Sequence, residues 1–195
     1  MKDLLIHGGS IVTPERVFFA DVAITGEEIV AIGPDLERDA WQIVDASGAF
    51  LFPGFIDSHV HFNEPGRTEW EGISSGSRAL AAGGGTLYFD MPLNSTPPTL
   101  EGSALLRKRE IAEAKSVTDF ALWGGLTPVN LNAMEELANL GVVGFKAFMS
   151  DSGISDFPRA DSDTAHEARR ALGRGPSHVR SFRRSRCGHG PACRN

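Results

Sequence analysis

The sequence predicts an α/β protein in which a small β module precedes a run of strand–helix repeats. The first fifty or so residues are short apolar segments separated by glycine-containing turns, a pattern typical of β-strands. From residue 54 onward, apolar strand-like segments alternate with helical ones, which indicates βαβ units and a parallel sheet. The composition then changes at about residue 162. We therefore divide the chain into residues 1–53, 54–161 and 162–195.

The N-terminal module is expected to contain two hairpins. Gly8-Gly9 and Gly26 each separate two apolar segments, and tight turns accept glycine because it lacks a Cβ. The expected strands cover residues 4–6, 10–12, 21–24, 28–32 and 41–45.

The middle segment is expected to hold about four βα units. Thr68 and Glu71 have the spacing of a capping box, which predicts a helix start at Thr68, and Gly83-Gly84-Gly85 predicts its end. A complete (β/α)₈ barrel needs about 250 residues, so at most half a barrel fits here, and an open doubly wound sheet suits the unit length equally well. Strands are expected at residues 55–62, 86–91, 119–123 and 142–149, and helices at 68–82, 100–115 and 131–139.

Charge and composition narrow the classes of partner. The net charge of the chain is −6. Basic side chains outnumber acidic ones in residues 162–195, whereas acidic ones dominate residues 1–161. An acidic body is unsuited to binding nucleic acid. No apolar run reaches the roughly 18–20 residues that span a bilayer. The N-terminus lacks the pattern of a signal peptide. Both cysteines, Cys187 and Cys193, lie in the last segment, and a body without cysteine predicts a cytoplasmic protein.

The last segment differs from the rest. Its basic residues are all arginine, and Gly, Pro, His and Cys are scattered without helical or strand periodicity. Two interpretations remain open for residues 162–195: a disordered basic extension, or translation in a shifted reading frame from about residue 162.

His59-Val60-His61 is the clearest candidate for chemistry. Side chains two residues apart on a strand point the same way, so both imidazoles can reach one metal ion. Asp57 could orient one of these ligands, or it could cap a local turn. The alternative for the histidines is a pair of partly buried side chains bonded to backbone.

Lys146 lies in the apolar segment Gly144–Met149 and is the second candidate. A buried lysine is costly unless paired, and burial lowers its pKa, so it can become a neutral nucleophile that carbon dioxide converts to a carbamate. Such an anion could bridge two metal ions. A lysine whose head reaches solvent from the strand end is the alternative.

Residues 53–61, Pro-Gly-Phe-Ile-Asp-Ser-His-Val-His, resemble the opening of the cyclic amidohydrolases, the group that includes dihydroorotases, hydantoinases and allantoinases. Residues 144–148, Gly-Phe-Lys-Ala-Phe, resemble the strand that carries this family's carboxylated lysine. The resemblance covers residues 1 to about 161. It implies a partial (β/α)₈ TIM barrel preceded by part of a small β-sandwich domain.

Within this family, the sequence is most similar to the allantoinases. Asn63 stands where dihydroorotases typically carry an arginine for the substrate carboxylate, and an amide cannot form that ion pair. The segments 63–72 and 149–161 also look like allantoinase. The resemblance therefore implies hydrolytic opening of the allantoin ring to allantoate, with dihydroorotase or hydantoinase activity as the alternative.

The resemblance also implies a site. Two divalent ions, expected to be zinc, would be held by His59, His61 and N6-carboxylated Lys146, and Asn94 and Ser152 would contact a small cyclic amide. The family's later ligands, two histidines and a catalytic aspartate, have no match here. A non-enzymatic remnant or interaction module is therefore the alternative of another class. Full-length members of the family are expected to be homo-oligomers.

Overall fold

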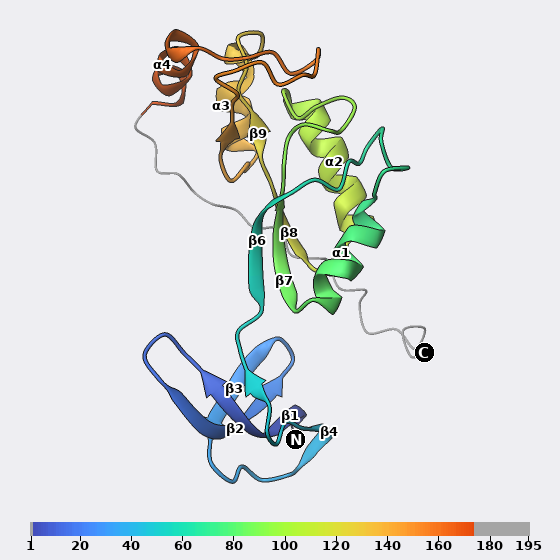
Figure 1. Ribbon diagram of the computed structural model, residues 1–195, viewed down its shortest axis with the longest axis vertical. Helices are drawn as coiled ribbons and strands as arrows, with labels where there is room; N and C mark the ends of the chain where they lie inside the picture. The colour runs from blue at the N-terminus through green and yellow to red at the C-terminus, as the bar shows by residue number, and fades with distance from the viewer. Residues whose placement is uncertain (1, 174–195) are drawn as a thin grey trace. The chain divides into compact units, whose positions relative to one another are not determined.

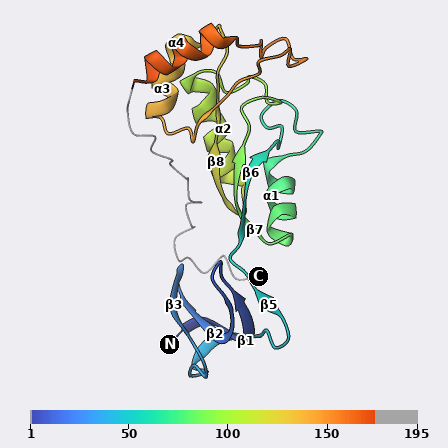
Figure 2. The ribbon, with the colours of Figure 1, turned by 60° about the vertical axis from the view of Figure 1, so that its left-hand side comes forward.

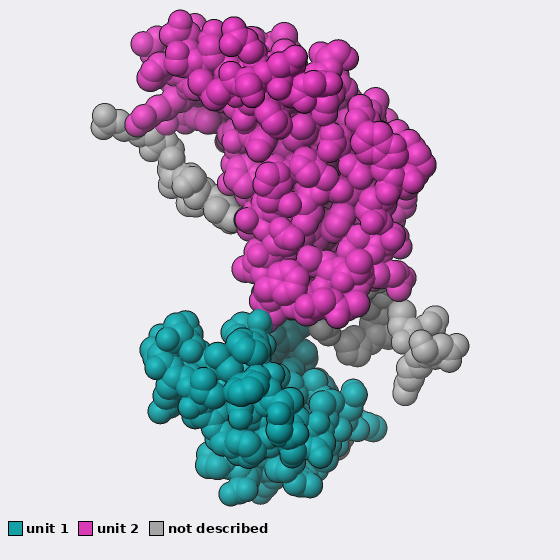
Figure 3. Space-filling model, viewed as in Figure 1, with its two compact units in different colours: residues 1–53 teal, residues 54–195 magenta. Residues whose placement is uncertain are grey.

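The computed structural model describes residues 2–173. The chain forms two compact units, residues 1–53 and residues 54–195 (Figure 3). Unit 1 holds one sheet and unit 2 holds two small sheets, and each unit has its own buried apolar clusters. Among residues 2–173, no helix combines the length and apolar character needed to cross a membrane.

Unit 1 is a five-stranded sheet. Its central strand β1 pairs antiparallel with β2 and parallel with both β4 and β5, and β3 extends the sheet beyond β2. The strands are β1 (Lys2–Val12), β2 (Val17–Thr25), β3 (Glu28–Gly33), β4 (Ala40–Asp45) and β5 (Phe50–Leu51). The β2–β3 hairpin at Gly26, where φ is +61°, confirms one of the two expected turns.

The other expected hairpin is wrong. Gly8-Gly9 lies inside the continuous strand β1, where the register with β2 shifts between Ile6 and Gly9. Gly8 has φ +72°, and its amide donates to Asp21 Oδ1 at 2.8 Å. The two glycines thus form a bulge, because a buried carboxylate on the neighbouring strand accepts the amide that leaves the ladder.

Side chains are buried on both faces of this sheet, since Leu5 and Ala23, which pair across β1 and β2, are fully buried on the face opposite Val22. Ile11, Ala20 and Val22 form its buried cluster. Large apolar side chains elsewhere in the unit stay exposed, including Phe19 at 67% and Trp41 at 76%. Residues 1–53 supply a single sheet layer.

Unit 2 is built from parallel strands alternating with helices (Figures 1 and 2). Strands β6, β7 and β8 pair in that order, and β9 pairs with β10, all parallel. The elements are β6 (Phe55–Val60), α1 (Ile73–Ala82), β7 (Gly85–Asp90), α2 (Gly102–Lys115), β8 (Asp119–Leu122), β9 (Gly124–Gly125), η1 (Leu131–Ala133), α3 (Met134–Asn139), β10 (Phe145–Lys146) and α4 (Ser162–Leu172).

The two small parallel sheets of unit 2 are joined through Trp123, the residue between β8 and β9. Its amide donates to Asp90 O at 3.0 Å, and the Val143 amide donates to Leu122 O at 3.0 Å. Four strand positions therefore follow one another in the order of the sequence, as in a (β/α)₈ barrel. The expectation of a partial barrel with about four βα units is confirmed.

The core of unit 2 lies between the strands and the helices α1 and α2, which contact each other. Ile73, Tyr88, Leu105 and Phe120 are fully buried there. Burial of such side chains contributes roughly 1.5–3 kcal/mol each relative to exposure. This packing fixes the strand ends that carry the candidate site.

Helix α1 begins at Ile73 rather than at Thr68. Its N-cap, Gly72, is extended and makes no side-chain cap, whereas Glu64 Oε2 accepts the Ile73 amide at 3.0 Å. Lys115 of α2 pairs with the same Glu64 carboxylate. A tertiary contact has therefore replaced the local capping box.

Helix α4 lies at the start of the arginine-rich segment, in which the sequence showed no helical periodicity. Asp161 Oδ1 accepts the amide and the hydroxyl of Thr164, at 2.9 and 2.7 Å, and so caps the helix. Ala168 of α4 is buried against Leu126 and Met134. The remainder of the arginine-rich segment, including both cysteines, lies outside the described residues.

Candidate functional site

His59 and His61 lie at the C-terminal end of β6. Their ring centroids are 5.4 Å apart, and the ring planes are inclined by 53°. His59 is exposed and His61 is half-buried. The structure thus brings both imidazoles to the strand end where (β/α)₈ barrels place their active sites.

His61 is held by groups from the next strand's loop. The side-chain nitrogen of Asn94 lies 3.3 Å from His61 Nδ1, and Asn94 itself adopts φ +65°. Burial lowers the pKa of the His61 imidazole, and this effect outweighs the opposing influence of Asp90. The neutral imidazole, which is the form that binds metal, is therefore favoured at neutral pH.

Among the described residues, Asp57 bonds to backbone and not to an imidazole. Its Oδ1 accepts the backbone amide of His59 at 3.0 Å. This contact fixes the backbone just before the histidine pair. The local-turn alternative therefore describes Asp57 in this structure.

Lys146 is half-buried, which lies between the two alternatives that the sequence left open. β10 pairs for only two residues, Phe145 and Lys146, with Gly124 and Gly125. The Lys146 ammonium lies 4.9 Å from the ring centroid of Phe148. This distance is that of a cation–π contact, so the ammonium lies against an aromatic face.

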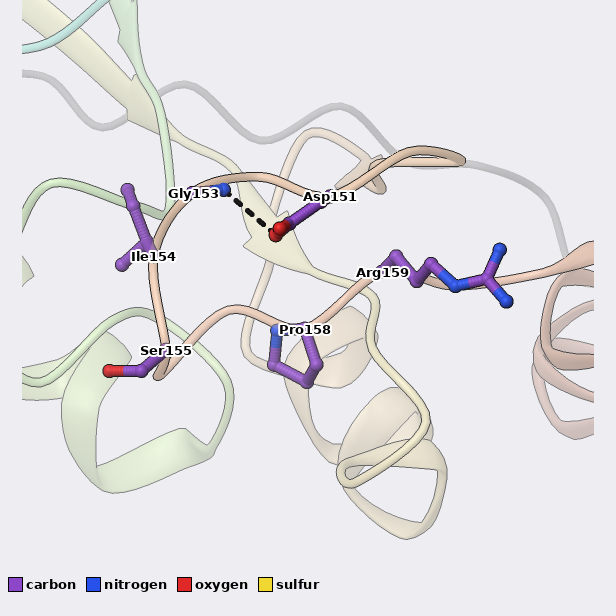
Figure 4. Close-up of a pocket in the computed structure, with 6 residues that line it drawn as sticks. All are labelled: Asp151, Gly153, Ile154, Ser155, Pro158 and Arg159. Carbon is purple, nitrogen blue, oxygen red and sulfur yellow. Dashed lines mark hydrogen bonds between the residues drawn. The ribbon is translucent and has the colours of Figure 1, made fainter.

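Ser152 stabilises its own loop. Its hydroxyl donates to Phe157 O at 2.6 Å and accepts the Ile154 amide at 3.1 Å. The loop borders a cavity of about 580 Å³ (Figure 4), lined by Asp151, Gly153, Ile154, Ser155, Pro158 and Arg159. In Figure 4 the Asp151 carboxylate points toward the Gly153 amide, which donates to it at 3.0 Å.

A buried ion pair that the sequence patterns did not predict lies near His61. Lys108 Nζ lies 2.9 Å from Asp90 Oδ2, and both side chains are almost fully buried. Helical spacing was the available signal, because Lys108 falls on the same face of α2 as Ala104, Leu105 and Ala112.

The donor chemistry of the site fits a metal ion. Two neighbouring imidazoles, one held neutral by burial, are common ligands of zinc and related divalent ions. Catalytic zinc usually has three protein ligands. Within residues 2–173, no group of three or more His, Cys, Asp or Glu side chains could hold a metal ion, so a third ligand must be of another kind or lie elsewhere.

Comparison with protein families finds a match to the model described as "Amidohydrolase family" over residues 50–183. Among curated proteins, the chain is 55% identical to an allantoinase from Solibacter usitatus over 174 residues, which cover 89% of this chain and 38% of that protein. It is 52% identical to an allantoinase from Desulfitobacterium hafniense over 84% of this chain and 36% of that protein. The chain thus spans little more than a third of these relatives.

Solved structures agree on the fold. The L-hydantoinase (dihydropyrimidinase) from Arthrobacter aurescens superimposes with a TM-score of 0.80 at 30% identity, covering 86% of this chain and 38% of that one. The dihydropyrimidinase from Brevibacillus agri gives a TM-score of 0.71 at 35% identity, covering 86% of this chain and 36% of that one.

Proposed function

Because the chain belongs to the amidohydrolase family, we propose that it forms the N-terminal part of a metal-dependent cyclic amidase that opens the allantoin ring to allantoate. The supporting observation is sequence identity of 50–55% to several curated allantoinases over more than four-fifths of the chain. The structural relatives that are hydantoinases or dihydropyrimidinases share only about 27–35% identity. Allantoin is therefore favoured over hydantoins.

Asn63 supports the same choice of substrate. Asn63 lies two residues after His61 in the sequence. It adopts a left-handed backbone conformation, with φ +59°, next to the site. An amide at this position offers no cation for the ring carboxylate of dihydroorotate. A neutral ureide ring such as allantoin needs no such partner.

His59, His61 and Lys146 are the groups of this chain that we assign to metal binding. A divalent metal, zinc by the chemistry of these ligands, would supply an activated water and polarise the ring carbonyl. Lys146 would take this role as its carbamate, which forms when carbon dioxide adds to the neutral amine and one N–H proton is released to solvent. The carbamate anion could then be shared by two ions. The carbamate would be the ligand that the histidine pair lacks.

Asn94 has a second task in this proposal. Its amide lies beside His61 at the strand end, and amides can pair with both the donors and the acceptors of a ureide ring. Asn94 would therefore orient the ring while it steadies the imidazole. Ser152 would act indirectly, by keeping the loop of residues 151–157 in shape.

A chimera tests the proposed substrate. Residues 1–161 of this chain would be joined to the remaining part of the Solibacter usitatus allantoinase, and turnover of allantoin, dihydroorotate and hydantoin would be compared. Allantoin should be hydrolysed fastest, and a matched His59→Ala chimera should be inactive. Faster turnover of dihydroorotate would contradict the assignment.

The same chimera tests Lys146. Its activity should depend on bicarbonate, and Lys146→Ala should lose one equivalent of metal, measured by plasma mass spectrometry. Short carboxylic acids should restore part of the activity, because they can replace the bridging carbamate. Full metal content and full turnover in the alanine variant would show that the lysine is structural only.

A further inference from the structure

Lys108 on helix α2 makes two contacts deep inside unit 2. Its side chain is 2% exposed, and its ammonium lies 2.9 Å from Asp90 Oδ2 and 2.7 Å from Met91 O. Both partners stand where β7 ends and the loop toward Asn94 begins. One ammonium therefore holds a side chain and a main-chain carbonyl at the same strand end.

Asp90 also bonds to the segment that carries the histidines. Its Oδ1 accepts the amide of Phe62, the residue directly after His61, at 3.1 Å. The Met91 amide donates to Val60 O at 2.9 Å, on the other side of His61. The backbone of His61 is thus held from both of its neighbours by residues that contact Lys108.

The loop that begins at Met91 holds the imidazole as well. Asn94, three residues further along, places its amide 3.3 Å from His61 Nδ1. A shift of the Met91 carbonyl would displace this loop relative to β6. Lys108 is therefore connected to the backbone of His61 through Asp90 and to its ring through Met91 and Asn94.

The cost of this arrangement indicates that it serves more than packing. A buried charge is expensive, and apolar side chains of similar volume often replace a buried ion pair without loss of stability. The neighbours of Lys108 on the buried face of α2 are small or apolar: Ala104, Leu105 and Ala112. A leucine or methionine would be the ordinary choice at this position.

We propose that Lys108 is a positioning residue that fixes the orientation of His61 through its contacts with Asp90 and Met91 O. The inference rests on the proposed function for the assignment of His59 and His61 as ligands. Residues that orient a metal ligand without touching the metal typically change metal affinity by about 10- to 100-fold when they are removed. Lys108 touches no substrate and takes no part in bond breaking.

The experiment compares variants of the 195-residue chain. Lys108→Met alone leaves the Asp90 charge buried without its partner and is expected to destabilise the fold. The double variant Asp90→Asn with Lys108→Met removes both charges and keeps a side-chain oxygen for the Phe62 amide, so most of the stability should return. Arg107→Met, at an exposed position of α2, is the matched control.

Two measurements are made on each protein: the ¹⁵N shifts of the His61 ring without metal, and Co²⁺ affinity from the absorption of the bound ion. The double variant should unfold near the wild-type urea concentration but bind Co²⁺ about 10-fold or more weakly, with altered ring shifts. The Arg107→Met control should match the wild type. Wild-type ring shifts and Co²⁺ affinity in the double variant would overturn the inference.

A separate result identifies failure of the proposed function. If the wild-type chain shows no Co²⁺ signal that depends on His59, the metal assignment is lost. The metal-free ring shifts then decide the role of Lys108 by themselves. Altered shifts in the double variant support positioning of His61, and unchanged shifts refute it.

Discussion

Gly76→Ala tests how closely α1 packs against the segment that carries the histidines. Gly76 lies in the buried part of α1, and a Cβ built on it would stand 2.3 Å from two ring atoms of Phe62. Phe62 follows His61 directly and is itself 8% exposed, with its ring edge-on to Tyr88 at 4.7 Å. The ring has little free space into which it could move.

The expected effect is the balance of two opposing terms. Alanine stabilises a helix interior by about 0.8–1.0 kcal/mol relative to glycine. Carbon atoms pack best at about 3.5–4.0 Å, so the ring or the helix would have to move by more than about 1 Å. Overpacking of this kind costs about 1–3 kcal/mol, and the upper half of this range applies because Phe62 is enclosed. The net loss in the free energy of unfolding should be about 1–2 kcal/mol.

Urea unfolding followed by circular dichroism measures this loss. The matched control is Ser75→Ala, at an exposed position of the same helix, which should gain a few tenths of a kcal/mol from helix propensity alone. Gly76→Ala should also shift the His61 ring resonances, because Phe62 is displaced. A Gly76→Ala protein as stable as the Ser75→Ala protein would refute the packing argument.

Three further predictions concern the stability of each unit. Leu105→Ala, at a fully buried position, should lower the free energy of unfolding by about 2–5 kcal/mol, whereas Leu106→Ala, at a position 47% exposed, should change it by about 0.5 kcal/mol or less in urea titrations. Glu64→Ala removes the acceptor for the first amide of α1 and should cost about 1–3 kcal/mol in the same assay. Burial alone would raise the pKa of Asp21, but hydrogen bonds from two backbone amides and from His7 lower it overall. The ionised Asp21 carboxylate therefore stabilises unit 1 fully at pH values well above 3.8, its pKa in the unfolded chain. This stabilisation is lost as the pH falls through the lower pKa of Asp21 in the folded protein. Asp21→Asn should therefore make the urea midpoint less dependent on pH in the acid range.

The sequence determined the elements whose signals are local. The alternation of apolar strands and helices from residue 54 predicted the parallel sheet, and the spacing of His59 and His61 on one strand predicted two imidazoles on the same side. Gly26 marked the β2–β3 hairpin correctly. Such signals depend on neighbouring residues alone, which is why they can be read without a structure.

The tertiary structure decided what depends on residues far apart in the chain. Thr68 and Glu71 have the spacing of a cap, yet α1 starts at Ile73 because Glu64 reaches its first amide. Gly8-Gly9 has the pattern of a hairpin turn, but it forms a bulge in which the Asp21 carboxylate accepts the Gly8 amide. These local patterns admitted two outcomes, and a distant hydrogen-bond partner selected between them.

The environment of the candidate site also came only from the structure. The sequence places Asn94 and Lys108 on a loop and a helix, with no sign that one contacts His61 and the other anchors the strand ends beside it. Lys146 was recognised from its apolar neighbours, but only the structure shows that it is half-buried and that its ammonium lies near the Phe148 ring. The sequence therefore indicated candidate groups such as His59 and His61. The packing of α2 and the strand ends decided how His61 is held, because that depends on contacts across the sheet that no local pattern records.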